Sequence, residues 1–141
     1  MEQPMQPPAS HVRLRGTLSY RLVPRGREWQ GVDVLVGTHQ QRASGRLELV
    51  VLSGAGNVVR RATADLAAAG DNEWLHFEFA PIANAAGCAF VLRFRLAAPG
   101  RGTRLSLYDT AAEATRPTRR ALRRLGLHPT RNSLYCRLRY A

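Results

Sequence analysis

Four large aromatic side chains are the residues best suited to contact a ligand: Trp29, Trp74, Tyr108 and Tyr135. Sugar-binding surfaces of β-rich domains expose aromatic planes that cover the apolar faces of pyranose rings, with polar side chains nearby for the hydroxyl groups. Trp74 and Tyr135 alternate with the apolar residues of their segments, so they lie on the opposite strand face. Each ring is therefore either an exposed platform or a ring that loops cover, and the same alternatives apply to Trp29.

A second candidate site is the arginine-rich segment 111–131. It holds six arginines and one glutamate, and thus a net +5 of the chain's +11. Guanidinium groups pair bidentately with phosphate, so the segment can grip nucleic acid, a lipid headgroup or a phosphate-bearing glycan precursor, or it can be a solvated insertion. Thr118 as a cap and Gly126 as a terminator predict a short helix between them. The candidate anion-binding residues are Arg116, Arg119, Arg120, Arg123 and Arg124.

The basic composition of the whole chain has two interpretations. A net charge of +11 and a sequence pI near 11.4 are typical of a phosphate-binding protein. However, all 21 basic residues are arginine, a bias that a GC-rich genome produces without selection for phosphate contacts. Under the second interpretation the arginines are scattered over solvated strand faces.

Catalytic and metal-binding motifs find little support. The four histidines, His11, His39, His76 and His128, match no metal-ligand spacing, and no serine lies in a GxSxG turn. Glu78 and His76 share a strand face and could form an acid/base pair, but a glycosidase also needs an aromatic-lined cleft. We expect no enzyme activity, no cofactor and no metal site, and leave open a structural calcium ion in the loops.

The two cysteines, Cys88 and Cys136, form neither a zinc motif nor a CxxC redox motif. Cys88 is in phase with Phe90 and Cys136 with Leu134, so both are expected to face the core as small apolar side chains. A disulfide between them would require neighbouring strands.

The element that must position the central aromatic candidate lies within residues 71–87. Leu75, Phe77 and Phe79 alternate with Trp74, His76 and Glu78, which predicts a half-buried antiparallel strand. Pro81 and a small-residue run that ends at Gly87 then predict the end of the strand and a turn.

The same period of two predicts strands along most of the chain, and it places on one face of its strand each of the sets Val32, Val34 and Val36; Leu47, Leu49 and Val51; and Phe90, Leu92, Phe94 and Leu96. A glycine-containing hairpin turn is expected at residues 53–57, and Asp65 is expected to cap a single helical turn. The fold class is therefore an all-β, antiparallel, jelly-roll-like β-sandwich of about eight strands, with a short basic helical insertion before the last strand. Residues 1–10 form a disordered tail and residues 11–141 the domain. Besides the strand within 71–87, the expected strands are 11–23, 29–38, 46–52, 58–63, 90–96, 103–109 and 133–140.

The order of four motifs resembles the carbohydrate-binding-module-like β-sandwich domains found beside bacterial glycosyltransferases and polysaccharide-biosynthesis proteins. The motifs are GVDVLVGT (31–38), SGRLELVVLSGAGNVVR (44–60), DNEWLHFEFAPIANAAG (71–87) and FVLRFRL (90–96), and the resemblance covers about residues 30 to 110. These 141 residues show no counterpart of a catalytic domain, and the arginine-rich segment is not part of the shared pattern. The most specific part consists of Asp71, Asn72, Trp74, Phe77, Phe79, Pro81, Ile82 and Gly87.

Three functional hypotheses follow. The resemblance implies a non-catalytic carbohydrate-binding-like accessory domain in bacterial surface polysaccharide biosynthesis. The charge pattern alternatively suggests a binder of nucleic acid or another anionic partner through residues 116–131, and the sheet faces suggest a structural docking module for a separate glycosyltransferase. The N-terminal sequence MEQPMQPPAS lacks the pattern of a signal peptide and no apolar run is long enough to span a bilayer, so we expect a cytoplasmic protein.

Overall fold

The computed structural model describes residues 10–40, 42–110 and 133–141, and in these ranges every element except one short helix is a β-strand. The single helix, η1 (Leu66–Ala68), is one 3-10 turn. The strands are β1 (Ser10–Arg13), β2 (Thr17–Leu22), β3 (Trp29–Gly37), β4 (Arg46–Ser53), β5 (Val58–Asp65), β6 (Glu73–Ile82), β7 (Phe90–Ala97), β8 (Ser106–Thr110), β9 (Ser133–Leu134) and β10 (Cys136–Tyr140).

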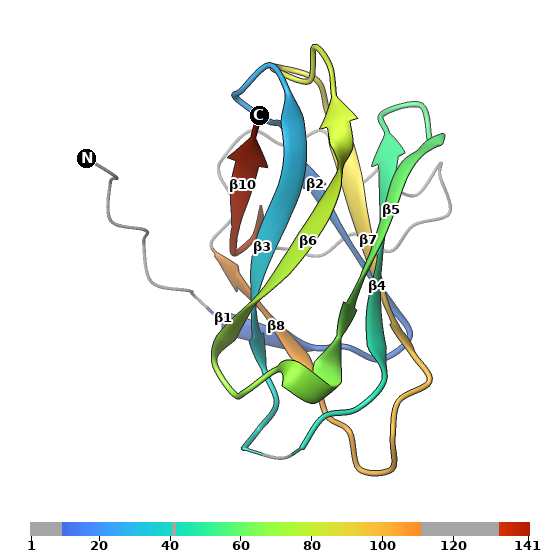
Figure 1. Ribbon diagram of the computed structural model, residues 1–141, viewed down its shortest axis with the longest axis vertical. Coiled ribbons are helices and arrows are strands. Elements are labelled where there is room, and N and C mark those ends of the chain that lie inside the picture. The colour runs from blue at the N-terminus through green and yellow to red at the C-terminus, as the bar shows by residue number, and fades with distance from the viewer. Residues whose placement is uncertain (1–9, 41, 111–132) are drawn as a thin grey trace, which may run out of the picture.

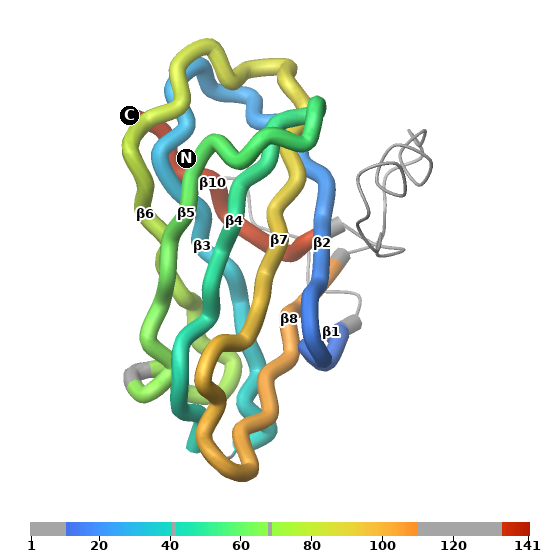
Figure 2. The backbone as a smooth tube through the Cα atoms, turned by 90° about the vertical axis from the view of Figure 1, so that its right-hand side faces the viewer, coloured from blue at the N-terminus to red at the C-terminus, as the bar shows by residue number. Residues whose placement is uncertain are grey.

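The strands form two antiparallel sheets packed face to face. Sheet A has the order β1-β8-β3-β6, with β10 also beside β3 and β9 beside β8, and sheet B has the order β2-β7-β4-β5. Figure 1 shows β10, β3 and β6 in one layer and β4, β5 and β7 in the other, and the order of sheet B is visible in Figure 2. These two strand orders are those of an eight-stranded jelly roll, so the predicted all-β, antiparallel, jelly-roll-like sandwich is confirmed.

The core lies between the inner faces of the two sheets. The valines at positions 32, 34 and 36 of β3 are fully buried, as are Phe77 of β6 and Phe94 of β7. The rings of Phe77 and Phe94 meet across the two sheets with centroids 5.9 Å apart. Burial of this apolar surface is the main favourable term in folding, and the predicted inward faces of β3, β4, β6 and β7 are confirmed.

Two predicted local structures are also confirmed. In the turn between β4 and β5, the backbone N–H of Gly56 donates to Ser53 O (2.9 Å), and that of Ser53 donates to Asn57 O (2.8 Å). At the start of η1, the Asp65 carboxylate accepts a hydrogen bond from the backbone N–H of Ala67 (2.9 Å). Both structures depend on neighbouring residues alone, which is why the sequence pattern identifies them.

The expected first strand, residues 11–23, is wrong as a single element. The chain forms β1 in sheet A, leaves that sheet near Leu14, and enters sheet B as β2. Gly16 lies between the two strands with a φ of +78°, a conformation that glycine adopts without strain. The alternation of apolar residues continues through this crossover, so the sequence shows one strand where the molecule has two.

The expected last strand, residues 133–140, is likewise divided. Leu134 of β9 pairs with Asp109 of β8, whereas Cys136 of β10 pairs with Val34 of β3. Tyr135 lies between the two pairings, and its backbone N–H donates to Tyr108 O (3.0 Å). The C-terminal segment therefore crosses from one neighbouring strand to another within sheet A.

The two cysteines differ in environment. Cys136 is half-buried and packs against the core, as expected. Cys88 is exposed, which corrects the expectation that it faces the core, because β7 begins only at Phe90 and the alternation does not extend back to position 88. Both thiols are free, with no disulfide between them.

No helix in the described ranges is long and apolar enough to cross a lipid bilayer. The expected helical insertion at residues 111–131 lies outside those ranges, as does the expected N-terminal tail except for Ser10, which begins β1.

Candidate functional site

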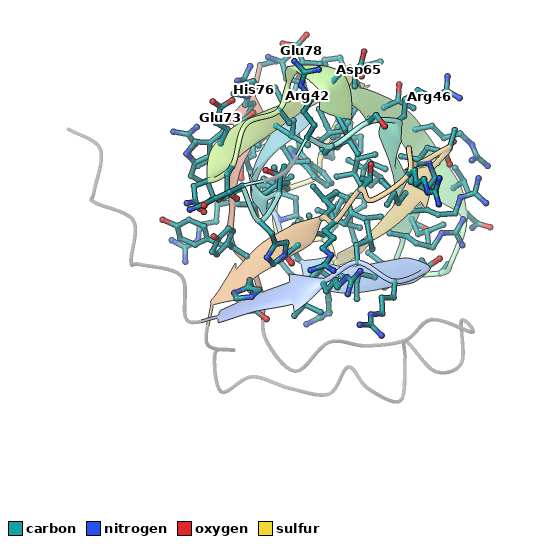
Figure 3. The ribbon with its side chains drawn as sticks, turned by 90° about the horizontal axis from the view of Figure 1, so that it is seen from below. Arg42, Arg46, Asp65, Glu73, His76 and Glu78 are labelled. Carbon is teal, nitrogen blue, oxygen red and sulfur yellow. The ribbon has the colours of Figure 1, made fainter. Side chains whose placement is uncertain are left out.

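Polar and aromatic side chains gather on the outer face of sheet A, across β6, β3 and β10. The strand register places His76 and Arg137 on either side of Asp33, and it places Glu78 and Arg139 on either side of Gly31. Trp74 lies opposite Leu35 on the same face. Figure 3 shows His76 and Glu78 on the outside of β6, away from the core.

Asp33 is the centre of this face. It is only 4% exposed although it points away from the core, because its neighbours on β6 and β10 cover it. Its carboxylate lies 2.7 Å from His76 Nδ1 and accepts a hydrogen bond from Arg139 Nε at 3.1 Å. A buried carboxylate is stable only when charged or polar partners replace its lost hydration, and these residues supply them.

Arg139 joins three groups on the outer face. Besides its bond to Asp33, one terminal nitrogen lies 2.8 Å from His76 Nδ1, and the other lies 3.5 Å from a Glu78 carboxylate oxygen. His76 Nδ1 cannot donate to Asp33 and accept from Arg139 at the same time. Two unprotonated acceptors 2.7 Å apart would repel, so a proton lies between His76 Nδ1 and Asp33.

An aromatic stack lies beside this ionic cluster. The Arg137 guanidinium carbon is 3.9 Å from the centroid of the Trp74 ring, a cation–π contact. The rings of Trp74 and Tyr135 have centroids 5.6 Å apart and planes inclined by only 30°. The three side chains come from β6, β10 and the junction of β9 and β10, so only the folded sheet brings them together.

Tyr108 belongs to a separate group near the end of β3. Its ring centroid is 5.9 Å from that of His11, which is in turn 5.9 Å from that of His39. The Tyr108 hydroxyl donates to the Asn72 side chain, and His39 Nε2 lies 2.8 Å from the Ser106 hydroxyl. The polar end of Tyr108 is therefore already engaged within the protein.

The Asp-Asn pair that contributes to the family resemblance has structural roles at this end of the sheet. The Asp71 carboxylate accepts hydrogen bonds from the backbone N–H groups of Thr38 (2.7 Å) and His39 (3.2 Å), where the chain leaves β3. Asn72 bonds to Tyr108. Both side chains fix loop geometry around the outer face.

The candidate role of Trp29 as an exposed platform is wrong. Trp29 is completely buried, its ring centroid lies 5.1 Å from those of Phe79 and Phe90, and its indole N–H donates to Gly31 O (2.7 Å). The strand register shifts between Trp29 and Gly31. This irregularity turns Trp29 inward, although strict alternation would place it on the outer face with Asp33.

The structure places the remaining candidates as follows. Trp74, Tyr108 and Tyr135 are half-buried and belong to the outer face of sheet A, but only Trp74 and Tyr135 are in mutual contact. The anion-binding candidates Arg116, Arg119, Arg120, Arg123 and Arg124 lie outside the described residues.

Sequence reasoning missed Asp33, Arg137 and Arg139 as site residues. The available signal was a single charged residue, Asp33, within the otherwise apolar strand VDVLV. A charge in a strand that is covered on both sides needs a partner. Its partners on β10 lie more than 100 positions away, and nothing in the sequence pairs them with it.

One titratable group under this face, the Cys136 thiol, is perturbed by burial. Burial, followed by the charge of Asp33, raises the pKa of the Cys136 thiol to about 12. His76 has no hydroxyl or thiol as a hydrogen-bond partner among the residues described. Within the same ranges, no three His, Cys, Asp or Glu side chains are grouped to hold a metal ion.

No protein-family model, curated protein or solved structure matches this chain. Its function is therefore inferred from the outer face of sheet A together with the sequence motifs.

Proposed function

We propose that this protein is a non-catalytic, carbohydrate-binding-like accessory domain that binds a glycan on the outer face of sheet A, in bacterial surface polysaccharide biosynthesis. The observation that carries the proposal is the contact of Trp74 and Tyr135 beside the polar cluster of Asp33, His76 and Arg139. The biosynthetic context is supported by the motif resemblance of residues 30 to 110.

The chemistry of this face suits a sugar. Pyranose rings have apolar faces that pack on aromatic rings, and their hydroxyl groups need both donors and acceptors. Tyr135 provides the ring, the 46% exposed Arg137 provides donors, and Glu78 provides an exposed acceptor with 79% of its side chain accessible. A rigid sheet positions these groups better than loops do.

A glycan array probed with the wild-type domain and with Tyr135→Ala and Trp74→Ala variants tests the proposal. We expect the wild type to bind a defined group of glycans and both variants to lose at least about 10-fold in affinity, which corresponds to about 1.4 kcal/mol. Val58→Ala serves as the control, because Val58 is an exposed (45%) apolar side chain on β5 of sheet B.

Two outcomes would refute the proposal. The first is the absence of any bound glycan on a broad array. The second is binding that both aromatic variants retain while their circular dichroism spectra match that of the wild type, since sugar contact would then lie elsewhere.

A second candidate function is the binding of an anionic polymer, and the outer face of sheet B favours it. The register places Arg61 and Arg93 on either side of Val50, and Arg21 and Arg95 lie on the same face. Glu48 is the acid on this face that pairs with one of them, Arg95, at 3.2 Å. This function would use sheet B together with the arginines of residues 116–131.

Duplex DNA binding as a function of salt tests this second candidate. An Arg61→Gln/Arg93→Gln variant should reduce the salt dependence of binding, the slope of log K against log salt, by about 2. A slope equal to that of the wild type would exclude the sheet B face as the contact surface.

A further inference from the structure

We infer that the glycan bound by the outer face of sheet A is acidic, and that Arg137 binds its carboxylate group. The inference rests on the proposed function, since it names the chemical class of the ligand at the same site. It follows from the unequal way in which the two arginines of β10 are used.

Arg139 is saturated by protein groups. Its Nε bonds to Asp33, and its terminal nitrogens lie within 2.8 Å of His76 and 3.5 Å of Glu78. Each edge of its guanidinium therefore already faces a partner. A ligand would have to break an ionic cluster around a buried carboxylate to use Arg139, which is costly.

Arg137 keeps its donors for a ligand. Its nearest carboxylate oxygen, Asp33 Oδ2, lies 3.8 Å from Nε, which is beyond hydrogen-bonding distance. No hydrogen bond from its terminal nitrogens joins it to any residue that the structure describes, and 46% of its side chain is exposed. A guanidinium with an open edge presents two parallel N–H donors, which match the two oxygens of a carboxylate.

The stack on Trp74 fixes the orientation of this open guanidinium. Arginine usually loses much side-chain entropy when it binds a ligand, but contact with an aromatic plane holds it in place beforehand. The guanidinium also covers the ring face of Trp74 beneath it. A neutral pyranose would need that face, whereas a carboxylate needs only the edge of Arg137, so the arrangement favours an acidic sugar.

An anionic group on a glycan can be a carboxylate or a phosphate, and both pair with guanidinium. The surroundings favour the single charge of a carboxylate. Arg137 and Arg139 lie on the same face as Asp33 and Glu78, so two positive charges are offset by two negative ones and the face has little surplus positive charge. A phosphate monoester, with a charge near −2, would leave part of its charge unpaired.

The test uses a panel of uronic-acid oligosaccharides, each printed beside its carboxyl-reduced neutral counterpart. The full-length wild type should bind at least one acidic member about 10-fold or more tightly than its reduced counterpart. Calorimetry with that member should show about 10-fold weaker binding for Arg137→Gln, and a clear loss for Arg137→Lys, which keeps the charge but not the planar fork. The control is Arg101, an exposed arginine in the turn after β7. Arg101→Gln removes the same charge as Arg137→Gln and should bind the oligosaccharide like the wild type.

The outcomes separate the inference from the proposed function. Equal or tighter binding of the reduced glycans would overturn the acidic ligand and leave the glycan-binding function standing. No binding to either set, or to the broad glycan array, would refute the function itself. Two results would overturn the role of Arg137 as a carboxylate ligand. One is an equal loss of affinity in Arg101→Gln. The other is displacement of the bound oligosaccharide by inorganic phosphate at concentrations where acetate has no effect.

Discussion

At the scale of single residues, Asp33 links folding to the proposed site. It lies between two fully buried valines of β3, yet its carboxylate faces outward and is covered by His76 and Arg139. One buried charge thus fixes the side chains of two neighbouring strands. The open arginine, Arg137, owes its position to the same carboxylate and to Trp74.

We expect Asp33→Asn to lower the free energy of unfolding by about 1 to 3 kcal/mol, because it removes a charged acceptor from Arg139 and His76. Urea denaturation at neutral pH measures the change. Glu48→Gln is the control, since the Arg95–Glu48 pair is exposed (63% and 32%) and such pairs contribute about 0 to 1 kcal/mol. A loss no larger than that of the control would show that Asp33 does not organise this face.

At the scale of elements, the two sheets are joined at one side by contacts between β5 and β6. Arg60 of β5 donates from Nε to Ala80 O (2.7 Å) and from a terminal nitrogen to Pro81 O (2.8 Å). Among the strands described, β6 pairs with β3 alone and is an edge strand. Pro81 is tolerated there because an edge strand needs no ladder donor on its outer side. The Arg60 side chain therefore satisfies carbonyl groups at a sheet edge.

Gly31 sets the close approach of β3 and β6 beneath Arg139. A Cβ atom added at this position would lie 2.7 Å from Phe77 O, a backbone atom that cannot move independently. We expect Gly31→Ala to destabilise the fold by about 1 to 3 kcal/mol and to displace Arg139. Thermal unfolding measures the first effect.

Gly54→Ala is the matched control for that substitution. Its added Cβ would meet only Ala89 O at 3.4 Å, and its φ is not positive, so the expected change in stability is within about 1 kcal/mol. Equal melting temperatures for the two variants would mean that β3 and β6 adjust freely at Gly31.

At the scale of the whole molecule, a phenol (Tyr20) and a thiol (Cys136) lie in or against the core of a chain that has no lysine. Burial, followed by the charge of Asp109, raises the pKa of Tyr20, and burial with the charge of Asp33 raises that of Cys136 to about 12. The Tyr20 hydroxyl has no hydrogen-bond partner among the described residues. Arginine stays charged throughout the alkaline range, so these groups are well placed to dominate the pH response.

We expect stability to fall as the pH rises from about 9 towards 12. Above its usual pKa of 9.0, Cys136 ionises in the unfolded chain but remains protonated in the folded one, so the folded state binds more protons and loses stability with increasing pH. Tyr20 acts in the same direction above its usual pKa of 10.0. Urea denaturation under reducing conditions, between pH 7 and 11, measures the slope.

A Tyr20→Phe/Cys136→Ala variant should flatten this dependence. Phenylalanine keeps the packing of Tyr20 against Phe94 and removes an unpaired hydroxyl, so the first substitution should be close to neutral at pH 7. A variant that retains the wild-type slope would assign the alkaline loss to other groups.

The sequence by itself determined the features that depend on near neighbours. Alternation of side chains identified the inward residues of β3, β4, β6 and β7, glycine placement identified the β4–β5 hairpin, and Asp65 identified the cap of η1. Together these were sufficient for the fold class, because a period of two with short connections is compatible with few architectures other than a sandwich.

The features that depend on strand pairing were determined only by the tertiary structure. The alternation of side chains does not indicate which sheet a strand joins. The sequence therefore did not predict the crossover at Gly16 or the division of the C-terminal segment into two strands. A register shift beside Gly31 buried Trp29, although its parity placed it outside. The juxtaposition of Asp33 with Arg137 and Arg139 arises from pairing between β3 and β10, which are far apart in the chain, and pairing of distant segments leaves no local periodic signal.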